Sequence, residues 1–274
     1  ALSPQLRLGT GVMAQSIQRL RDMMLEQRVN TNAGDLARWS ALSESLSAIE
    51  GLFNEPGEQG INAKLNALFN AFEELATRPD SLAARQQVLQ AARSLTETLR
   101  TLHRNLTTLE SQIQSQAVGT IEQANQLAQQ LARLNEQIRA AHSSGAEAGD
   151  LLDQRDRLIG QLSELIGARA HYNNDGSVML FVDGHTLVQD GAAFPLPTTI
   201  DLANRALDST PTDIRIQSGQ LRGLMDSLAQ LQSYRADLNT FASTLITQVN
   251  AIHSTGYGLD GNTGYLFFSG TDAS

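Results

Sequence analysis

Residues 151–167 read LLDQRDRLIGQLSELIG, and residues 168–190 follow directly with ARAHYNNDGSVMLFVDGHTLVQD. The first stretch predicts an amphipathic helix, with Asp150 as its N-terminal cap and Gly167 as its left-handed stop. Its inward face is formed by Leu151, Leu158, Leu162 and Leu165. In the second stretch the apolar period shortens to two, and the turns NNDG and DG tolerate positive φ, so three strands of a β-meander are predicted.

Helical spacing dominates the chain on both sides of this sheet. A heptad-like rhythm from Ser81 to His142 predicts one rod, which would reach about 90 Å if unbroken. Residues 221–252 return to helical spacing, and residues 61–75 form a short helix that ends before Pro79. The first helix is either continuous from about residue 11 to residue 53 or interrupted at NTNAGD. Trp39 lies on its apolar stripe and is expected to be a core anchor.

These elements predict a mainly α fold: an elongated bundle of long antiparallel helices with a small inserted antiparallel β domain. Residues 1–167 and 218–274 would form the discontinuous bundle, and residues 168–217 the β domain. DIRIQ, residues 213–217, offers a last strand. The sequence leaves open whether residues 194–213 are ordered.

Composition excludes several classes of function. The chain has 274 residues, a formal net charge of −9, 5% aromatic residues and no cysteine, so disulfides are excluded. Arginines are dispersed among acids, which argues against binding nucleic acid through its phosphates. No apolar run approaches the roughly 20 residues that cross a bilayer, so membrane insertion is not expected.

Sites of chemistry are few. His171 and His185 could approach one another across the meander, but the expected reading is two plain surface histidines. Residues 256–261 match G-x-G-x-x-G yet follow a helix, where a dinucleotide site needs a preceding strand. Asp260 begins a stretch like a calcium loop but lacks the later ligands. Because no nucleophile has a base at a recognisable spacing, neither an enzyme nor a cofactor or metal is expected.

Several stretches, in order, resemble the flagellar hook-associated protein 1 family. They are DLLDQRD with QLSEL in residues 150–165, IQR and RD near residues 17–22, LSAIEGLFNEPGEQGI (46–61), LATRPDSLAARQQVL (75–89) and GYGLDGNTGYLFF (256–268). Each stretch is weak alone, but the ordered combination is specific and covers most of the chain.

The resemblance implies a structural, non-enzymatic subunit of the extracellular bacterial flagellum, secreted and located at the hook-filament junction. It implies packing against copies of itself, the hook protein and the second junction protein. The terminal segments of the family, which would bind an export chaperone and drive polymerisation, are not recognised in the chain. A core fragment that behaves as a monomer is therefore expected.

Two sets of residues are predicted to form contacts between subunits. The first consists of solvent-facing charges on the helix of residues 151–167: Asp153, Arg155, Asp156 and Arg157. The second is the exposed rim of the β domain: Asn174, Asp175, His185 and Asp190. Alternative functions are another flagellar axial protein such as flagellin, or a secreted helical adhesin or translocator whose β segment would bind cells or glycans.

Overall fold

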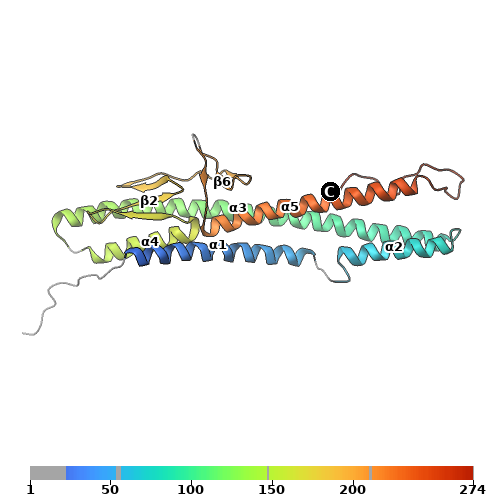
Figure 1. The fold of residues 1–274 in the computed structure, drawn as a ribbon, viewed down its shortest axis with the longest axis horizontal. Coiled ribbons are helices and arrows are strands. Elements are labelled where there is room, and N and C mark those ends of the chain that lie inside the picture. The colour runs from blue at the N-terminus through green and yellow to red at the C-terminus, as the bar shows by residue number, and fades with distance from the viewer. Residues whose placement is uncertain (1–22, 54–56, 147, 210–211, 274) are drawn as a thin grey trace, which may run out of the picture.

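A computed structural model of the chain describes residues 23–53, 57–146, 148–209 and 212–273. Three lines of helix lie side by side along an elongated body (Figure 1). One line contains α1 (Met23–Phe53) and α2 (Ile61–Thr77), the second is α3 (Leu82–Ser144), and the third contains α4 (Gly149–Ile166) and α5 (Gly219–His253). The predicted mainly α class with an inserted β segment is confirmed.

The helix lines differ in direction. α3 runs antiparallel to the other two lines, as expected (Figure 1). Three contacts, in which the residue numbers rise together, show that α1 runs parallel to α4 and α5. Gly34 lies against Ser163, Arg38 pairs with Asp226, and the Phe53 and Tyr234 ring centroids are 5.8 Å apart. α1 therefore passes first along α4 and then along α5.

The rod predicted from Ser81 onward is confirmed as one unbroken helix. α3 has 63 residues, which corresponds to about 95 Å at 1.5 Å per residue. The Ser81 hydroxyl caps it by accepting a hydrogen bond from the Ala84 amide at 3.2 Å. Gly145 ends it with a φ of 69°. A row of buried leucines at heptad spacing faces the other helices: Leu95, Leu99, Leu102 and Leu106.

α1 is also continuous through NTNAGD. Gly34 is required there by packing, since a Cβ atom would lie 2.8 Å from the Ser163 carbonyl oxygen of α4. The close contact of the two helices offsets the roughly 1 kcal/mol that glycine costs in a helix relative to alanine. The predicted start near residue 11, the apolar residues Met13, Ile17 and Leu20, and the IQR and RD motif lie outside the described residues, as do residues 54–56.

The prediction for the C-terminal end of α4 is confirmed, and the prediction for its N-terminal end is wrong. Gly167 has φ 66° and ψ 30°, so the predicted left-handed stop is confirmed. The prediction that Asp150 is the N-cap is wrong: α4 begins at Gly149, and Ala148 occupies the cap position without a side-chain hydrogen bond. Asp150 lies in the first turn instead, where the helix dipole favours its negative charge.

The β segment contains two small antiparallel sheets (Figure 1). The first is the predicted meander, β1 (Arg169–Tyr172), β2 (Val178–Val182) and β3 (His185–Gln189), extended by β4 (Ala192–Ala193). Asp183 and Gly184 have φ values of 49° and 80°, as the predicted tight turn requires. A register shift at Leu180 and Phe181 bulges the ladder between β2 and β3.

Sequence patterns did not predict the second sheet. It contains β5 (Ile200–Asp201), β6 (Ala206–Leu207) and β7 (Ile214–Arg215), so the strand expected in DIRIQ pairs here. Two-residue strands are too short to show a period of two. Residues 194–209, whose order was open, are described throughout.

One hydrophobic core runs through both the bundle and the β segment. It joins Leu106 and Leu131 of α3, Leu228 of α5, and Leu180 and Leu187 of the meander, all almost fully buried. Among the described residues, no helix is long and apolar enough to cross a membrane.

Candidate functional site

The β segment leaves the bundle where one helix line is broken between α4 and α5. Gly167 ends α4 and Gly219 begins α5, and a Cβ atom on Gly219 would lie 2.6 Å from the Ile166 and Gly167 amide nitrogens. Gly219 also has a φ of 84°, so only glycine fits this position without strain. Beside the break, the Ser218 hydroxyl donates a hydrogen bond of 2.7 Å to the Asp35 carboxylate of α1. Both ends of the β segment are thereby held at one point of the bundle.

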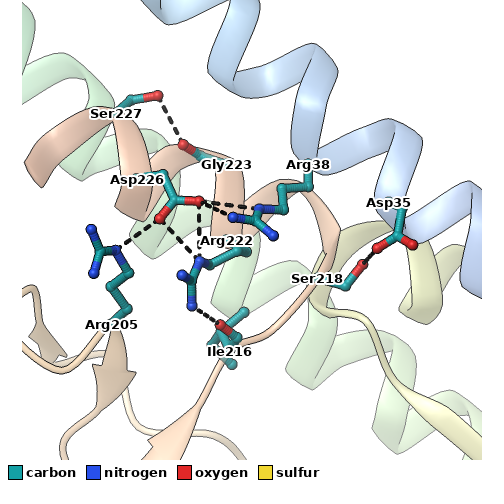
Figure 2. Close-up of polar contacts among 9 residues, drawn as sticks. All are labelled: Asp35, Arg38, Arg205, Ile216, Ser218, Arg222, Gly223, Asp226 and Ser227. Carbon is teal, nitrogen blue, oxygen red and sulfur yellow. Dashed lines mark hydrogen bonds and ion pairs between the residues drawn. The ribbon is translucent and has the colours of Figure 1, made fainter. Parts of the chain in front are cut away.

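Asp226 of α5 is the centre of an ionic cluster at this break (Figure 2). Its carboxylate lies 2.8 Å from a guanidinium nitrogen of Arg38, 3.0 Å from that of Arg222 and 2.8 Å from that of Arg205. Arg38 comes from α1, Arg222 from α5 and Arg205 from the turn between β5 and β6. One carboxylate therefore joins two helices and the second sheet, and the cluster contains three guanidiniums for one carboxylate.

The same region of α5 approaches α1 closely. A Cβ atom on Gly223 would lie 2.2 Å from the Arg38 carbonyl oxygen and 2.9 Å from the Ala41 Cβ. Ser227, one turn later, is buried and donates its hydroxyl hydrogen bond to the Gly223 carbonyl oxygen (Figure 2). Small residues on both helices thus allow the backbones to come together where the Asp226 cluster is formed.

Two asparagines of α3 attach the other side of the β segment. Asn135 is 0% exposed; its amide nitrogen donates to the Val178 and Asp190 carbonyl oxygens at 2.8 and 2.9 Å, and its oxygen accepts from the Val178 amide at 3.0 Å. Asn125 binds both backbone groups of Leu196, at 2.7 and 2.9 Å. Because unpaired backbone groups are costly when buried, these two amides fix the register of the β segment on α3.

Of the four predicted contact residues on α4, Asp153 and Arg157 are exposed, Asp156 is half-buried, and Arg155 is not on the solvent face. Arg155 is 5% exposed, and its guanidinium bonds the Asp156 carboxylate at 2.9 Å, donates to the Gly176 carbonyl oxygen and lies 5.0 Å from the Tyr172 ring centroid. The predicted solvent exposure was wrong for Arg155 because the β hairpin folds back over this face of α4. Arg155 joins α4 to the hairpin instead.

The four residues predicted on the rim of the β segment also differ in their exposure. Asn174 and Asp190 are exposed, and Asp190 pairs with Arg139 of α3 at 3.4 Å. Asp175 accepts hydrogen bonds from the Ser177 hydroxyl at 2.6 Å and amide at 3.0 Å, and these bonds hold the pKa of its carboxyl below the ordinary value. His185 is half-buried and pairs with the buried Val182, so it faces inward and not toward the rim.

The residues that hold this region together include several that sequence reasoning missed: Asn125, Asn135, Asp226 and Gly223. A weak signal was present for Asn135, since it follows Leu131 by four residues and so interrupts the apolar face of a long helix. Asparagine is a poor helix former, so a buried one indicates a specific partner. Asp226 gave no such signal, because Arg38 and Arg205 are distant in sequence.

The outer face of α1 carries exposed apolar side chains. Its buried face consists of Gly34, Ala41, Ser45 and Ile49. Away from that face, four apolar residues follow one another at steps of four, seven and three: Leu25, Val29, Leu36 and Trp39. All four are more than half exposed.

Trp39 is 57% exposed, so the prediction of a core anchor is wrong. The buried face of α1 passes through Gly34, Ala41, Ser45 and Ile49, and Trp39 does not share this face, so the indole lies outside. There it stacks under the Arg38 guanidinium at 4.8 Å and lines a groove of about 810 Å³ with Leu42, Leu46 and Tyr234.

The motifs considered for metal and nucleotide binding have structural explanations. His171 pairs with Met179 and His185 with Val182, three residues apart on β2, so alternation directs the two histidines to opposite faces of the sheet. In residues 256–261 the Gly258 amide bonds the Asn262 carbonyl oxygen at 2.7 Å, which closes a turn. Hydrogen bonds from Asn262 and Tyr265 lower the pKa of Asp260 in that turn. Within the described ranges, no group of three or more potential ligands could hold a metal ion.

The fold and this region together define a class: an elongated, helix-built structural protein that presents an apolar helix face and a firmly attached β segment. Comparison with known proteins then gives the family. A sequence profile of the "Flagellar hook-associated protein FlgK helical domain" matches residues 46–268, and the chain belongs to this family.

Named relatives agree with the profile. The flagellar hook-associated protein 1 of Salmonella typhimurium strain LT2 is 27% identical over 277 residues, covering 96% of this chain and 50% of the relative. That of Bacillus subtilis strain 168 is 24% identical over 233 residues, covering 83% of this chain and 46% of the relative. The chain thus spans about half the length of the relatives it matches.

A solved structure gives the same result at the level of the fold. The flagellar hook junction protein FlgK from Burkholderia pseudomallei matches with a TM-score of 0.72 and 26% sequence identity, over 87% of this chain and 45% of that one. The ordered motifs identified in the sequence were therefore a reliable guide to the family.

Proposed function

We propose that the chain is the helical part of a structural subunit at the junction between hook and filament of the bacterial flagellum. The observation that carries the proposal is the family profile over residues 46–268, on a bundle whose central helix has 63 residues. Such a body transmits force along its length, because three helix lines share one continuous core. A junction subunit needs this stiffness between two polymers that move together.

The proposal includes the partners and the location that the family suggests. The subunit would pack against copies of itself, the hook protein and the second junction protein, after secretion to the cell exterior and with help from an export chaperone. It would act by packing alone, without catalysis. The absence of cysteine suits a chain that folds after export, since no disulfide has to form.

The parts of the chain would have separate tasks. Residues 1–167 and 218–274 would form the packing bundle, and residues 168–217 a projecting β part that shares its core. Asp153 and Arg157 on α4, together with Asn174 and Asp190 on the β segment, are exposed and remain proposed contact residues. Exchange of the two α4 charges, Asp153→Arg with Arg157→Asp, would weaken filament attachment if they form such contacts, and unchanged attachment would remove them.

Complementation tests the function directly. A strain that lacks its junction protein receives the complete gene that encodes this chain, under its own promoter, and electron microscopy counts the cells that retain filaments on their hooks. Rescue of attached filaments is expected, with an empty vector as the control. Cells that export the protein but still shed their filaments into the medium would overturn the proposal.

A further inference from the structure

The chain after α5 first forms a loop that is closed on the end of this helix. In residues 254–264 the carbonyl oxygen of Ser254, the C-cap of α5, accepts hydrogen bonds of 3.0 Å from the Gly264 amide and from the Thr263 hydroxyl. Tyr257 and Thr263 also pair as an antiparallel bridge. The loop is therefore bonded both to itself and to α5, and it forms a fixed base for the chain that follows.

The following residues return along the bundle, and in Figure 1 they run beside α5 toward the C-terminus. We call residues 265–273 the strap; they belong to no helix or strand. The Asn250 side-chain oxygen of α5 accepts hydrogen bonds from the Phe267 and Phe268 amides at 2.9 and 2.8 Å. Its nitrogen donates to the Phe268 carbonyl oxygen at 2.9 Å. One asparagine thus holds the backbone of the strap through three hydrogen bonds.

The strap also has apolar contacts, which lie toward its two ends. Phe267 packs between Phe72 of α2 and His253 of α5, and both pairs have ring centroids 5.4 Å apart. At the other end Ala273 is 2% exposed. Residues 269–272 between these contacts are exposed. The attachment is therefore concentrated at two places and is not continuous along the strap.

Packing beneath the strap is incomplete. A cavity of about 560 Å³ separates it from the helices, and its lining includes Leu95 and Leu99 of α3, Leu245 and Ile246 of α5, and residues 267–273 of the strap itself. Atoms on opposite sides of a cavity gain no dispersion energy from one another. Detaching the strap should therefore cost less than detaching a helix that is packed along its whole length.

Gly264 joins the fixed loop to the strap. It has a φ of 89°, and no heavy atom lies within 4 Å of the position that a Cβ atom would occupy. Glycine changes its backbone angles more easily than any other residue, and hinges are placed where a few residues absorb such a change. Next to it, one polar contact crosses to α5, since His253 Nδ1 lies 2.8 Å from the Tyr265 carbonyl oxygen. The junction is therefore suited to be a hinge.

We propose that the strap is a hinged conformational device, which opens as a unit about Gly264 while the closed loop and the helices keep their places. Opening separates Phe267 from Phe72, so α2 loses this contact and retains its packing on α3. Opening also exposes the wall of the cavity to solvent. Asn250 stabilises the closed state. This device belongs to the fold of the chain and does not depend on the proposed function.

Thiol labelling measures the opening, because the chain has no cysteine of its own. In the complete protein, Ala92→Cys places a thiol in the wall of the cavity, and Ala128→Cys places one at a fully buried position about 54 Å further along α3. Mass spectrometry of the two peptides follows labelling by a maleimide at low urea concentrations, and thermal unfolding verifies that each variant folds.

Position 92 is expected to be labelled at least about tenfold faster than position 128, because local opening needs less free energy than global unfolding. Its labelling rate should be nearly independent of urea, since opening of the strap exposes little surface. Labelling at position 128 requires the bundle to unfold and should accelerate as urea is added.

Asn250→Ala tests the bonds that hold the strap closed. Loss of the three hydrogen bonds should raise the labelling rate at position 92 by about tenfold or more in the absence of urea. Asn239→Ala is the matched control, because it removes another half-buried asparagine from α5, and it should leave this rate unchanged.

Two results would overturn the inference. Labelling at position 92 that rises with urea in parallel with position 128 would show that the strap detaches only when the whole chain unfolds. An equal labelling rate at position 92 with and without Asn250→Ala would show that the thiol is reached without opening of the strap.

Discussion

The rod and the β segment are stabilised in different ways. α3 contributes a row of fully buried apolar residues, among them Leu106, Ile121 and Leu131, and these contacts recur at helical spacing along its whole length. The β segment has short strands that share this core through Leu180 and Leu187. Polar side chains of the helices, chiefly Asn135, Arg155 and the Asp226 cluster, fix its place on the bundle.

This difference predicts how each region fails. Apolar contacts are many and interchangeable, so loss of one weakens the whole rod. Polar attachments are few and depend on geometry, so loss of one leaves buried groups without a partner at a single place. The rod should therefore unfold as a unit, whereas the β segment should loosen locally first.

Leu106→Ala should give the largest effect. Leu106 is 0% exposed in the middle of α3, and truncation of a buried leucine costs about 3 to 5 kcal/mol through lost transfer free energy and a cavity. Denaturant unfolding followed by circular dichroism measures the loss. Leu82→Ala, on the exposed start of the same helix, is the control and should change stability by less than about 0.5 kcal/mol. Equal effects at the two positions would refute a core along α3.

Asn135→Ala should cost about 2 to 4 kcal/mol, because it leaves the backbone groups of Val178 and Asp190 without their buried partner. Hydrogen exchange is expected to accelerate in β2 and at the turn of Asp190, with little change in α3 near Leu95. Asn125→Ala, whose contact with Leu196 is less buried, should have a smaller effect. Uniform acceleration over the whole chain would show that the β segment has no separate stability.

Asp226→Asn should cost about 1 to 3 kcal/mol, a value reduced by the partial exposure of Arg38, Arg205 and Arg222. Without the carboxylate, three guanidiniums repel one another where α1, α5 and the second sheet meet. Raising the salt concentration should restore part of the loss by screening that repulsion. Arg205→Gln, which removes one of the three cations, is expected to destabilise less. An Asp226→Asn protein as stable as wild type would indicate that packing at Gly223 alone holds the helices.

Sequence patterns predicted the rod because the residues that stabilise it recur at helical spacing. Every third or fourth residue of α3 is apolar, Ser81 and Gly145 mark its ends, and no distant residue is needed to interpret either signal. The meander could also be predicted from local sequence. Its turns have positive φ at Asp183, Gly184 and Gly176, and aspartate and glycine are residue types that tolerate this conformation. The second sheet was missed because strands of two residues carry no period.

The attachment of the two regions was not predictable in this way. Arg38, Arg205 and Asp226 are far apart in sequence, and nothing near any of them indicates the other two. Arg155 was placed in solvent because its helix position looked polar, whereas the hairpin covers it and supplies the Gly176 carbonyl oxygen. Trp39 was placed in the core for the opposite reason: its helix position looked apolar, whereas the face of α1 that packs inward passes through Gly34, Ala41, Ser45 and Ile49, and this is a property of the tertiary packing.

The smallest effect is expected from the pH dependence of the hairpin turn at Asp175. Bonds from the Ser177 hydroxyl and amide hold the pKa of this carboxyl below its ordinary value of about 3.9, so its contribution to stability is present above pH 4 and is lost as the pH falls through the lowered pKa. The group lies near solvent, so Asp175→Asn should cost less than about 1 kcal/mol at pH 7. The difference between the two proteins should shrink as the pH falls through the lowered pKa, measured by denaturant unfolding at each pH. A difference that is constant from pH 7 to pH 2 would assign the effect to the shape of the turn. The charge of the Asp175 carboxylate would then contribute nothing to the stability of the β segment.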